Sequence, residues 1–141
     1  MAAPLPKLAV ALAPLLPRLE LQAPVLAMME GALTAADGLD RLEAAGLLND
    51  ALRLVAHALP KREAVWWACM CADAVPDAAL PPADAAARAA AEQWVRKPAD
   101  DGLRRAAWDC VQKTAFGTPE AWAAVGAYWS GGSMAPEGQP A

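Results

Sequence analysis

The chain has 141 residues, the size of one ordinary domain and enough to bury a core without disulfides or metals. Its formal net charge is −4 and its pI is about 4.9, so no positive field attracts it to nucleic acid or to anionic lipid. Alanine is abundant, 13 residues are proline and six are tryptophan, whereas β-branched residues are few. This composition favours an all-α protein over any fold built on a sheet.

Residues 1–32 are predicted to form a Pro-rich N-terminal arm, because prolines at 4, 6, 14, 17 and 24 allow only short helices. The run from Lys7 to Leu16 has one positive charge followed by apolar residues, like the core of a signal peptide. Prolines interrupt it and no A-x-A cleavage site follows, so we expect neither export nor membrane insertion.

The first longer helix is predicted at about 35–45. Thr34 and Asp37 have the spacing of a capping box, and Gly46 is suited to end the helix. The next helix, at about 47–59, carries a stripe of apolar residues with steps of 4, 3 and 4, which predicts that they face the core: Leu48, Leu52, Val55 and Leu59.

Pro60 precedes a third helix at about 61–74, and a loop rich in Pro, Asp and Ala follows it. The segment 83–97 is a strong helix former, and its inner side is expected to carry Trp94 together with Ala87, Ala90 and Ala91. After Pro98, a further helix begins near Asp100 and Asp101, which can pair with Arg104 and Arg105.

The last helix is predicted from Thr118, as N-cap, with Pro119 in its first turn. Its apolar face is expected to consist of Trp122, Val125, Gly126 and Trp129. The sequence therefore predicts five or six short helices packed as helical hairpins, in a compact bundle or a short solenoid-like array. A helical domain would span residues 33–130, and residues 131–141 would form a flexible Gly/Pro tail.

The segment HALPKREAVWWACMCA, residues 57–72, gathers the residues that could carry chemistry. Cys69 and Cys71 lie two apart on a helix and point about 200° apart, so they cannot share one ion. His57 has only Asp50 and Arg53 at helical spacing, which gives no nucleophile to activate. We therefore expect no metal, no cofactor and no catalytic residue.

Residues 42–55 have the helix–Gly–helix outline of a DNA-binding motif. Arg53 is the only basic side chain among them, which is too little positive charge to bind DNA. The chain also contains no nucleophile elbow, phosphate-binding loop or dinucleotide fingerprint. A nucleic-acid partner and an enzymatic activity are therefore not expected.

Trp66 and Trp67 lie 100° apart on the helix predicted at 61–74, so both are covered only if that helix is central. If it is not, one Trp lies at the surface near the charged residues of the first turn, as in an interaction hot spot. The candidate partner-binding residues are then Lys61, Arg62, Glu63, Trp66 and Trp67. The alternative is a small-ligand-binding protein or small enzyme with a Trp-lined pocket that includes His57.

The segments GLLNDALRLVAHALPKREAVWWACMCA and FGTPEAWAAVGAYWSGGSMAPEG resemble the two most characteristic parts of an uncharacterised family of small helical bacterial proteins. That family is associated with gene neighbourhoods of type VI secretion systems, and no activity is assigned to it. The resemblance covers roughly residues 35–138. It implies a cytoplasmic adaptor or accessory protein that binds a protein partner, such as a secretion-system component.

Overall fold

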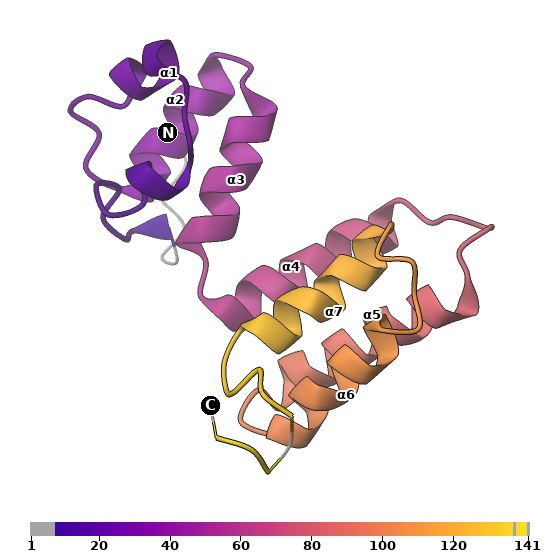
Figure 1. Cartoon of the computed structure of the whole chain (residues 1–141). Helices are drawn as coiled ribbons and strands as arrows, with labels where there is room; N and C mark the ends of the chain where they lie inside the picture. Colours follow the sequence, from indigo (N-terminus) through magenta and orange to yellow (C-terminus); the bar gives the residue numbers. More distant parts are fainter. Residues whose placement is uncertain (1–7, 137, 141) are drawn as a thin grey trace. The chain divides into compact units, whose positions relative to one another are not determined.

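A computed structural model describes residues 8–136 and 138–140, which form seven α-helices and a short 3-10 helix (Figure 1). The all-α prediction is confirmed, and these residues contain no strand. Five or six helices were expected. The additional one is α1, Ala23–Met28, which lies inside the predicted N-terminal arm.

The chain divides into two compact units, residues 1–60 and 61–141. This division differs from the predicted one, in which a single domain spanned 33–130 and residues 1–32 formed a separate arm. The arm was predicted from its prolines alone. Its leucines supply much of the apolar surface that the first unit buries.

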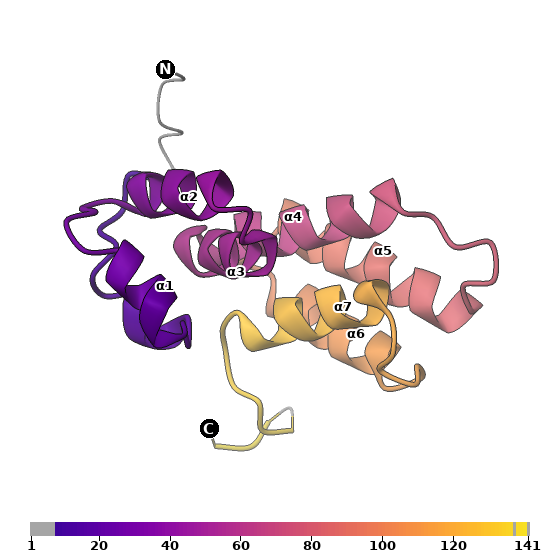
Figure 2. The same cartoon turned by 90° about the horizontal axis from the view of Figure 1, so that it is seen from above.

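The first unit is built on α2, Ala35–Ala44, and α3, Leu48–Ala58, which lie side by side (Figure 2). The segment before α2 is tied to it because the Leu12 N–H donates to the Leu33 carbonyl at 3.0 Å and the Ala35 N–H donates to the Val10 carbonyl at 2.9 Å. The buried core draws on both parts of the unit: Leu8, Leu12, Leu19, Met29, Ala35, Leu42, Ala51, Leu54 and Ala58.

The residues predicted to begin and end α2 do so in the structure. The Asp37 N–H donates to Thr34 Oγ1 at 3.2 Å, and the Thr34 N–H donates to Asp37 Oδ2 at 3.1 Å, which completes the capping box of α2. Gly46 has a φ of +72°, the left-handed conformation that ends a helix, directly after the cap of α2.

The predicted core stripe of α3 is wrong. Leu48 and Leu52 are exposed, whereas Ala51, Leu54 and Ala58 are buried. The two stripes are neighbours on one helix, and the segment 8–32 together with α2 covers the stripe that carries the smaller residues. Periodicity identified residues that share a face, but not which face the rest of the unit would cover.

The second unit contains α4, Lys61–Ala74, α5, Pro82–Arg96, α6, Asp101–Val111, and α7, Pro119–Trp129. Helix α7 packs against each of the other three. Thr118 fixes its start, as predicted, because Oγ1 accepts from the Ala121 N–H at 3.2 Å and also donates to Asp84 of α5. Asp84 is almost fully buried, so this hydrogen bond gives it a partner and joins the starts of the two helices.

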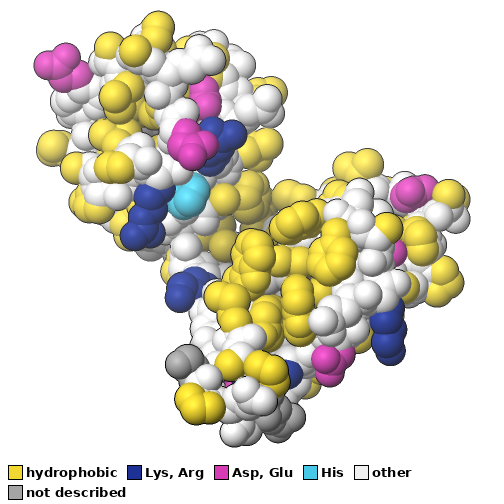
Figure 3. All heavy atoms as spheres, in the orientation of Figure 1, with side chains coloured by type: hydrophobic (Ala, Val, Ile, Leu, Met, Phe, Trp, Pro, Cys, Tyr) yellow, Lys and Arg dark blue, Asp and Glu magenta, His cyan; other side chains and the backbone are white. Residues whose placement is uncertain are grey.

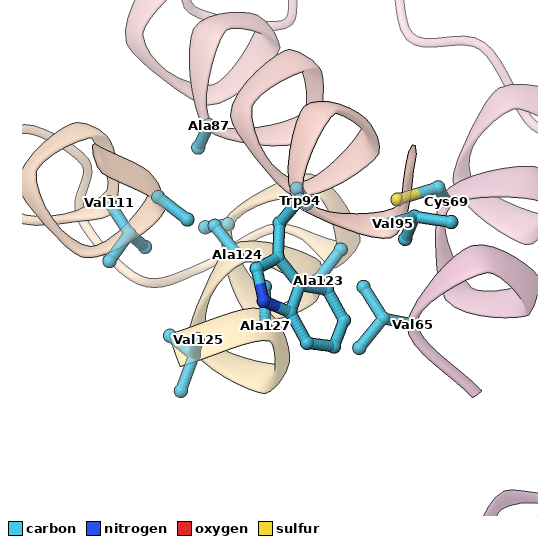
Figure 4. Close-up of a cluster of buried hydrophobic side chains, with 13 residues drawn as sticks. Val65, Cys69, Ala87, Trp94, Val95, Val111, Ala123, Ala124, Val125 and Ala127 are labelled. Atoms are coloured by element: carbon cyan, nitrogen blue, oxygen red, sulfur yellow. The ribbon is translucent and has the colours of Figure 1, made fainter. Parts of the chain in front are cut away.

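Alanine dominates the core of the second unit, and one large side chain fills the space that alanines leave. Figure 4 shows the indole of Trp94, from α5, among Ala123, Ala124 and Ala127 of α7, with Val65 of α4 beside it. The ring nitrogen Nε1 of Trp94 is buried and has no hydrogen-bond partner among the described residues. The predicted inner side of α5 is confirmed for Ala87, Ala91 and Trp94.

Residues 133–135 lie within the tail predicted at 131–141, and side chains of α6 donate hydrogen bonds to them. The guanidinium of Arg104, a buried side chain of α6, donates to the carbonyls of Tyr128 at 2.9 Å and Ser133 at 2.7 Å. Arg105 donates to the carbonyl of Ala135 at 2.9 Å. Gly132 has a φ of +66°, and a Cβ there would lie 2.7 Å from the Arg104 guanidinium, so only glycine fits this turn.

We predict that Trp94→Ala destabilises the second unit by roughly 3–5 kcal/mol, because it opens a large cavity in the core. Trp94→Phe should cost less, since it keeps most of the ring and removes a buried donor that has no acceptor. Urea unfolding followed by Trp fluorescence measures this unit alone, because every Trp of the chain lies after residue 60.

The matched control is Trp129→Ala, which removes the same side chain from the surface and should change the free energy of unfolding by less than about 1 kcal/mol. Equal losses for Trp94→Ala and Trp129→Ala would contradict the assignment of Trp94 as the filler of this core.

Candidate functional site

Three aromatic side chains follow one another along the outside of α7 and the loop before it. Trp122 and Trp129 are 51% and 56% exposed, and their ring centroids lie 6.3 Å apart at an interplanar angle of 70°. Phe116 is 38% exposed, and its ring centroid lies 6.5 Å from that of Trp122. The three rings therefore form a continuous edge-to-face row.

The indole of Trp122 is fixed by the backbone. Its Nε1–H donates to the Phe116 carbonyl at 2.9 Å, and Phe116 has a left-handed φ of +57° that turns the loop back toward the helix. Because the polar atom of the indole is bonded within the chain, the exposed part of Trp122 is its apolar ring.

Helix α4 packs beside this row, and a Cβ placed at Gly126 of α7 would lie 3.7 Å from Val65 Cγ2 of α4. Trp66 and Met70 lie one turn apart on α4 and are 43% and 53% exposed. They share a helix stripe with Arg62 and Asp73, which bond to α5, so this stripe lies on the α5 side of α4. We call the three rings beside α7 the aromatic face: Phe116, Trp122 and Trp129.

Figure 3 shows hydrophobic side chains gathered over the α4–α7 side of the second unit, with no charged side chain in the middle of the patch. The charged residues Arg62 and Asp73 of α4 remain largely exposed, although Arg62 Nε donates to the Val95 carbonyl at 2.6 Å and Asp73 accepts from Arg88 at 3.3 Å. Helix α7 carries one charged residue, Glu120, and it is buried. The exposed stripe of α7 is therefore uncharged.

The structure places all five predicted partner-binding residues in the first two turns of α4. Lys61 and Arg62 are exposed, and Glu63 Oε1 lies 3.9 Å from Arg62 Nη1. Trp66 is exposed, whereas Trp67 is half-buried, so the two indoles separate as their 100° spacing requires. None of the five belongs to the aromatic face.

The sequence predicted Trp122 and Trp129 on the apolar face of the last helix and did not propose them as a site. The structure leaves both exposed and buries their neighbours, including Ala121, Ala124 and Val125. One signal was present in the sequence. Five alanines and a glycine occupy other positions of α7, and small residues let neighbouring helices approach closely.

His57 lies on α3 in the first unit and is exposed. A pocket of about 300 Å³ lies in the second unit beside the C-terminal segment, and it is lined by Arg105, Trp108, Asp109, Tyr128, Met134, Ala135 and Pro136. The wall of this pocket contains one Trp ring and one Tyr ring, those of Trp108 and Tyr128. His57, which the alternative hypothesis includes, is not among its lining residues.

The polar groups of this pocket are bonded to the chain itself. The Tyr128 hydroxyl donates to the Met134 carbonyl at 3.0 Å, and its ring stacks on Trp108 with centroids 4.8 Å apart. Arg105 donates to Ala135, to Ser133 and to Asp101. These bonds hold the C-terminal segment in place.

No helix of the described residues has the length and apolarity needed to cross a membrane. Within residues 8–136 and 138–140, no three or more His, Cys, Asp or Glu side chains come together in a way that could hold a metal ion.

Burial raises the pKa of the Cys69 thiol to about 11, and the negative charge of Glu92 acts in the same direction. We therefore predict that Cys69 stays protonated at about pH 8 and is alkylated by iodoacetamide at least about tenfold more slowly than the exposed Cys71. Peptide mass spectrometry measures both rates in the native protein. Both thiols should react alike in urea, and equal native rates would contradict the burial of Cys69.

Hydrogen bonds from Arg104 and Arg105 lower the pKa of Asp101 below its usual value of 3.8. A carboxylate with a lowered folded pKa adds stability at neutral pH, and this contribution is lost as the pH falls through the folded pKa. Asp101→Asn should therefore be less stable than the wild type at neutral pH, and the difference should close between about pH 5 and pH 2.

The measurement is urea unfolding across that pH range. Asp109→Asn is the matched control, because Asp109 lies on the same helix, is exposed and makes no hydrogen bond or ion pair among the described residues. A difference between Asp101→Asn and the wild type that stays constant down to about pH 2 would exclude an electrostatic role for Asp101.

Comparison with known proteins gives one match. No curated protein and no solved structure matches the chain. The model of DUF6931, described as a family of unknown function, matches residues 38–141, a region that begins in α2 and includes the whole aromatic face. This confirms the expectation of an uncharacterised family, whereas an association with type VI secretion stays a prediction. The chain belongs to DUF6931, a family of unknown function.

Proposed function

We propose that this chain is a non-catalytic protein–protein interaction module and that its docking surface is the aromatic face of α7 and the loop before it. The observation that carries this proposal is the row of exposed rings, Phe116, Trp122 and Trp129, whose centroids follow one another at 6.5 Å and 6.3 Å. Trp is among the residues most enriched in interaction hot spots, where an apolar centre is enclosed by a polar rim.

The energy available at this face supports docking. A Trp side chain contributes about 150–250 Å² when buried, so each half-exposed indole offers on the order of 100 Å². Covering that area stabilises a complex by roughly 2–3 kcal/mol per Trp before the costs of association are subtracted. The two tryptophans of the row, with Phe116 beside Trp122, therefore supply the apolar centre that a docking surface requires.

The rings are also held in place before any partner arrives. Trp122 is fixed by its hydrogen bond to the Phe116 carbonyl, and the edge-to-face contacts order Trp129 and Phe116 around it. Rings that are already ordered lose little conformational freedom on binding, which raises affinity.

The pocket beside Tyr128 supports a small-ligand function less well. Its hydroxyl and guanidinium groups already donate to carbonyls of the C-terminal segment, so few donors remain for a ligand. At the aromatic face, by contrast, the apolar area is exposed in the part of the chain that the structure describes.

The cellular setting of this proposal comes from the sequence. The resemblance to proteins encoded near type VI secretion systems suggests an adaptor or accessory protein of such an apparatus. The three free cysteines, one of them exposed, favour a reducing compartment such as the cytoplasm.

The test is affinity capture from an extract of the source cells with quantitative mass spectrometry. We expect the wild-type chain to retain at least one protein, and the double variant Trp122→Ala/Trp129→Ala to retain at least about tenfold less of it. Val75→Ala is the matched control, because Val75 is an exposed apolar residue that lies just beyond the end of α4 and outside the aromatic face. Retention by the double variant equal to that of the wild type would rule out this docking surface.

A further inference from the structure

We infer that a second docking surface lies at the end of the second unit where α4 begins and α5 ends, and that it binds an acidic segment of a partner protein. Four basic residues lie there, which we call the basic end: Lys61, Arg62, Arg96 and Lys97. The chain has only 12 Lys and Arg in all, against 16 Asp and Glu. This surface is separate from the aromatic face, so it adds a second contact to the proposed function.

One hydrogen bond brings the two pairs of basic residues together. Arg62 Nε, in the first turn of α4, donates to the carbonyl of Val95, in the last turn of α5, at 2.6 Å. Lys61 directly precedes Arg62, whereas Arg96 and Lys97 directly follow Val95. All four basic residues are exposed. The two helix ends are 33 residues apart in the sequence, so only the fold gathers these charges.

The chain leaves most of this positive charge without a counter-charge. Lys61, Arg96 and Lys97 form no ion pair and no side-chain hydrogen bond among the residues that the structure describes. Glu63 Oε1 lies 3.9 Å from Arg62 Nη1, and only 25% of its side chain is exposed, against 52% for Arg62. An anionic partner would therefore meet cations that are accessible to it.

The acids that follow the basic end in the chain are bonded to α6. Asp100 Oδ1 accepts from the Gly102 N–H at 2.9 Å, as the N-cap of that helix. Asp101 lies 2.7 Å from Arg104 and 3.1 Å from Arg105. These bonds hold both carboxylates at the start of α6, where they act on its own backbone and arginines.

Helix stability explains only half of the basic end. Arg96 and Lys97 lie at the C-terminus of α5, where the helix dipole favours cations. Lys61 and Arg62 occupy the first turn of α4, where the free N–H groups make cations unfavourable. The two charges on α4 therefore act against their own helix, which favours a role outside the unit.

Two apolar side chains extend the basic end along α4. Arg62, Trp66 and Met70 occupy successive turns of one stripe, about 5.4 Å apart along the helix. Trp66 and Met70 are 43% and 53% exposed, and Trp and Arg are the residue types most enriched in hot spots. Asp73 follows on the same stripe and would repel acids there. The occupant that fits carries its acids at the Arg62 end and a large apolar side chain one or two turns away.

The charge of the whole chain favours a short acidic segment over a longer polyanion. The formal net charge is −4, so the surface around the basic end is acidic on balance. A nucleic acid or an anionic membrane extends over many charges and would be repelled by that surface. A short segment of a protein contacts the basic end alone.

The test is fluorescence anisotropy of the full chain with a fluorescein-labelled peptide of about ten residues, in which a run of Asp and Glu is followed by Leu. We expect saturable binding. The double variant Arg96→Glu/Lys97→Glu should weaken it at least about tenfold, and Trp66→Ala at least about fivefold. Lys113→Glu is the matched control, because Lys113 is an exposed base of the same unit that lies beyond the end of α6. Far-UV circular dichroism verifies that each variant is folded.

A second pair of measurements isolates the charges of the peptide. A peptide with Asn and Gln in place of Asp and Glu should bind at least about tenfold more weakly, since it keeps the apolar residues and removes the anions. Raising the salt concentration from about 0.05 M to about 0.5 M should weaken binding of the acidic peptide, because it screens exposed charges.

Three outcomes would overturn the inference. The first is no saturable binding of the acidic peptide up to on the order of 1 mM. The second is an equal loss of binding in Arg96→Glu/Lys97→Glu and Lys113→Glu, which would show attraction without a site. The third is tighter binding of labelled single-stranded DNA, or of vesicles of phosphatidylserine and phosphatidylcholine, than of the peptide.

The two docking surfaces can fail separately. The aromatic-face variant Trp122→Ala/Trp129→Ala should bind the acidic peptide as the wild type does, and loss of peptide binding in this variant would contradict a separate basic end. Arg96→Glu/Lys97→Glu binding the peptide as the wild type does overturns the basic end and leaves the aromatic face to its own capture test.

Discussion

The close packing of α7 against α4, α5 and α6 is the constraint on which the second unit depends. Small side chains let neighbouring helices approach closely, and four alanines of α7 are buried: Ala121, Ala123, Ala124 and Ala127. Three larger residues of the helix, Glu120, Val125 and Tyr128, are buried as well. The two tryptophans lie on the side of α7 that no helix of the unit covers.

The same constraint explains the role of Trp94. Alanine side chains bury little apolar area, and a core made from them alone would give a small hydrophobic stabilisation. A single indole from α5 restores area and fills the space between the helices, even though its ring nitrogen finds no acceptor. The unit therefore contains two kinds of Trp: one that holds the core together, and others that form an apolar surface.

Arg104 fixes the end of this arrangement. It is buried, its guanidinium lies 4.7 Å from the centroid of the Tyr128 ring, and it donates to two carbonyls that follow or end α7. Asp101 supplies the opposite charge at 2.7 Å. Because the last turn of α7 is held in this way, Trp129 projects from a helix end that is ordered, and the aromatic face is a fixed surface that extends to the end of the helix.

The sequence by itself determined the features that depend on neighbours in the chain. The capping box of Thr34 and Asp37, the end of α2 at Gly46 and the start of α7 at Thr118 follow from hydrogen bonds over a few residues, and the structure has each of them. The all-α class follows in the same way from composition. On α4, the sequence predicted the separation of Trp66 from Trp67, because it depends only on helix geometry.

Only the tertiary structure decided which stripe of each helix would be covered. In α3 the stripe of Leu48 and Leu52 and the stripe of Ala51 and Leu54 are both apolar, and the segment 8–32 covers the second. In α7 the alanines are buried and the tryptophans are exposed, because three neighbouring helices pack against the side that carries the alanines. Periodicity shows which residues share a face, but the free energy of burial depends on what else is available to cover that face and how closely it can approach.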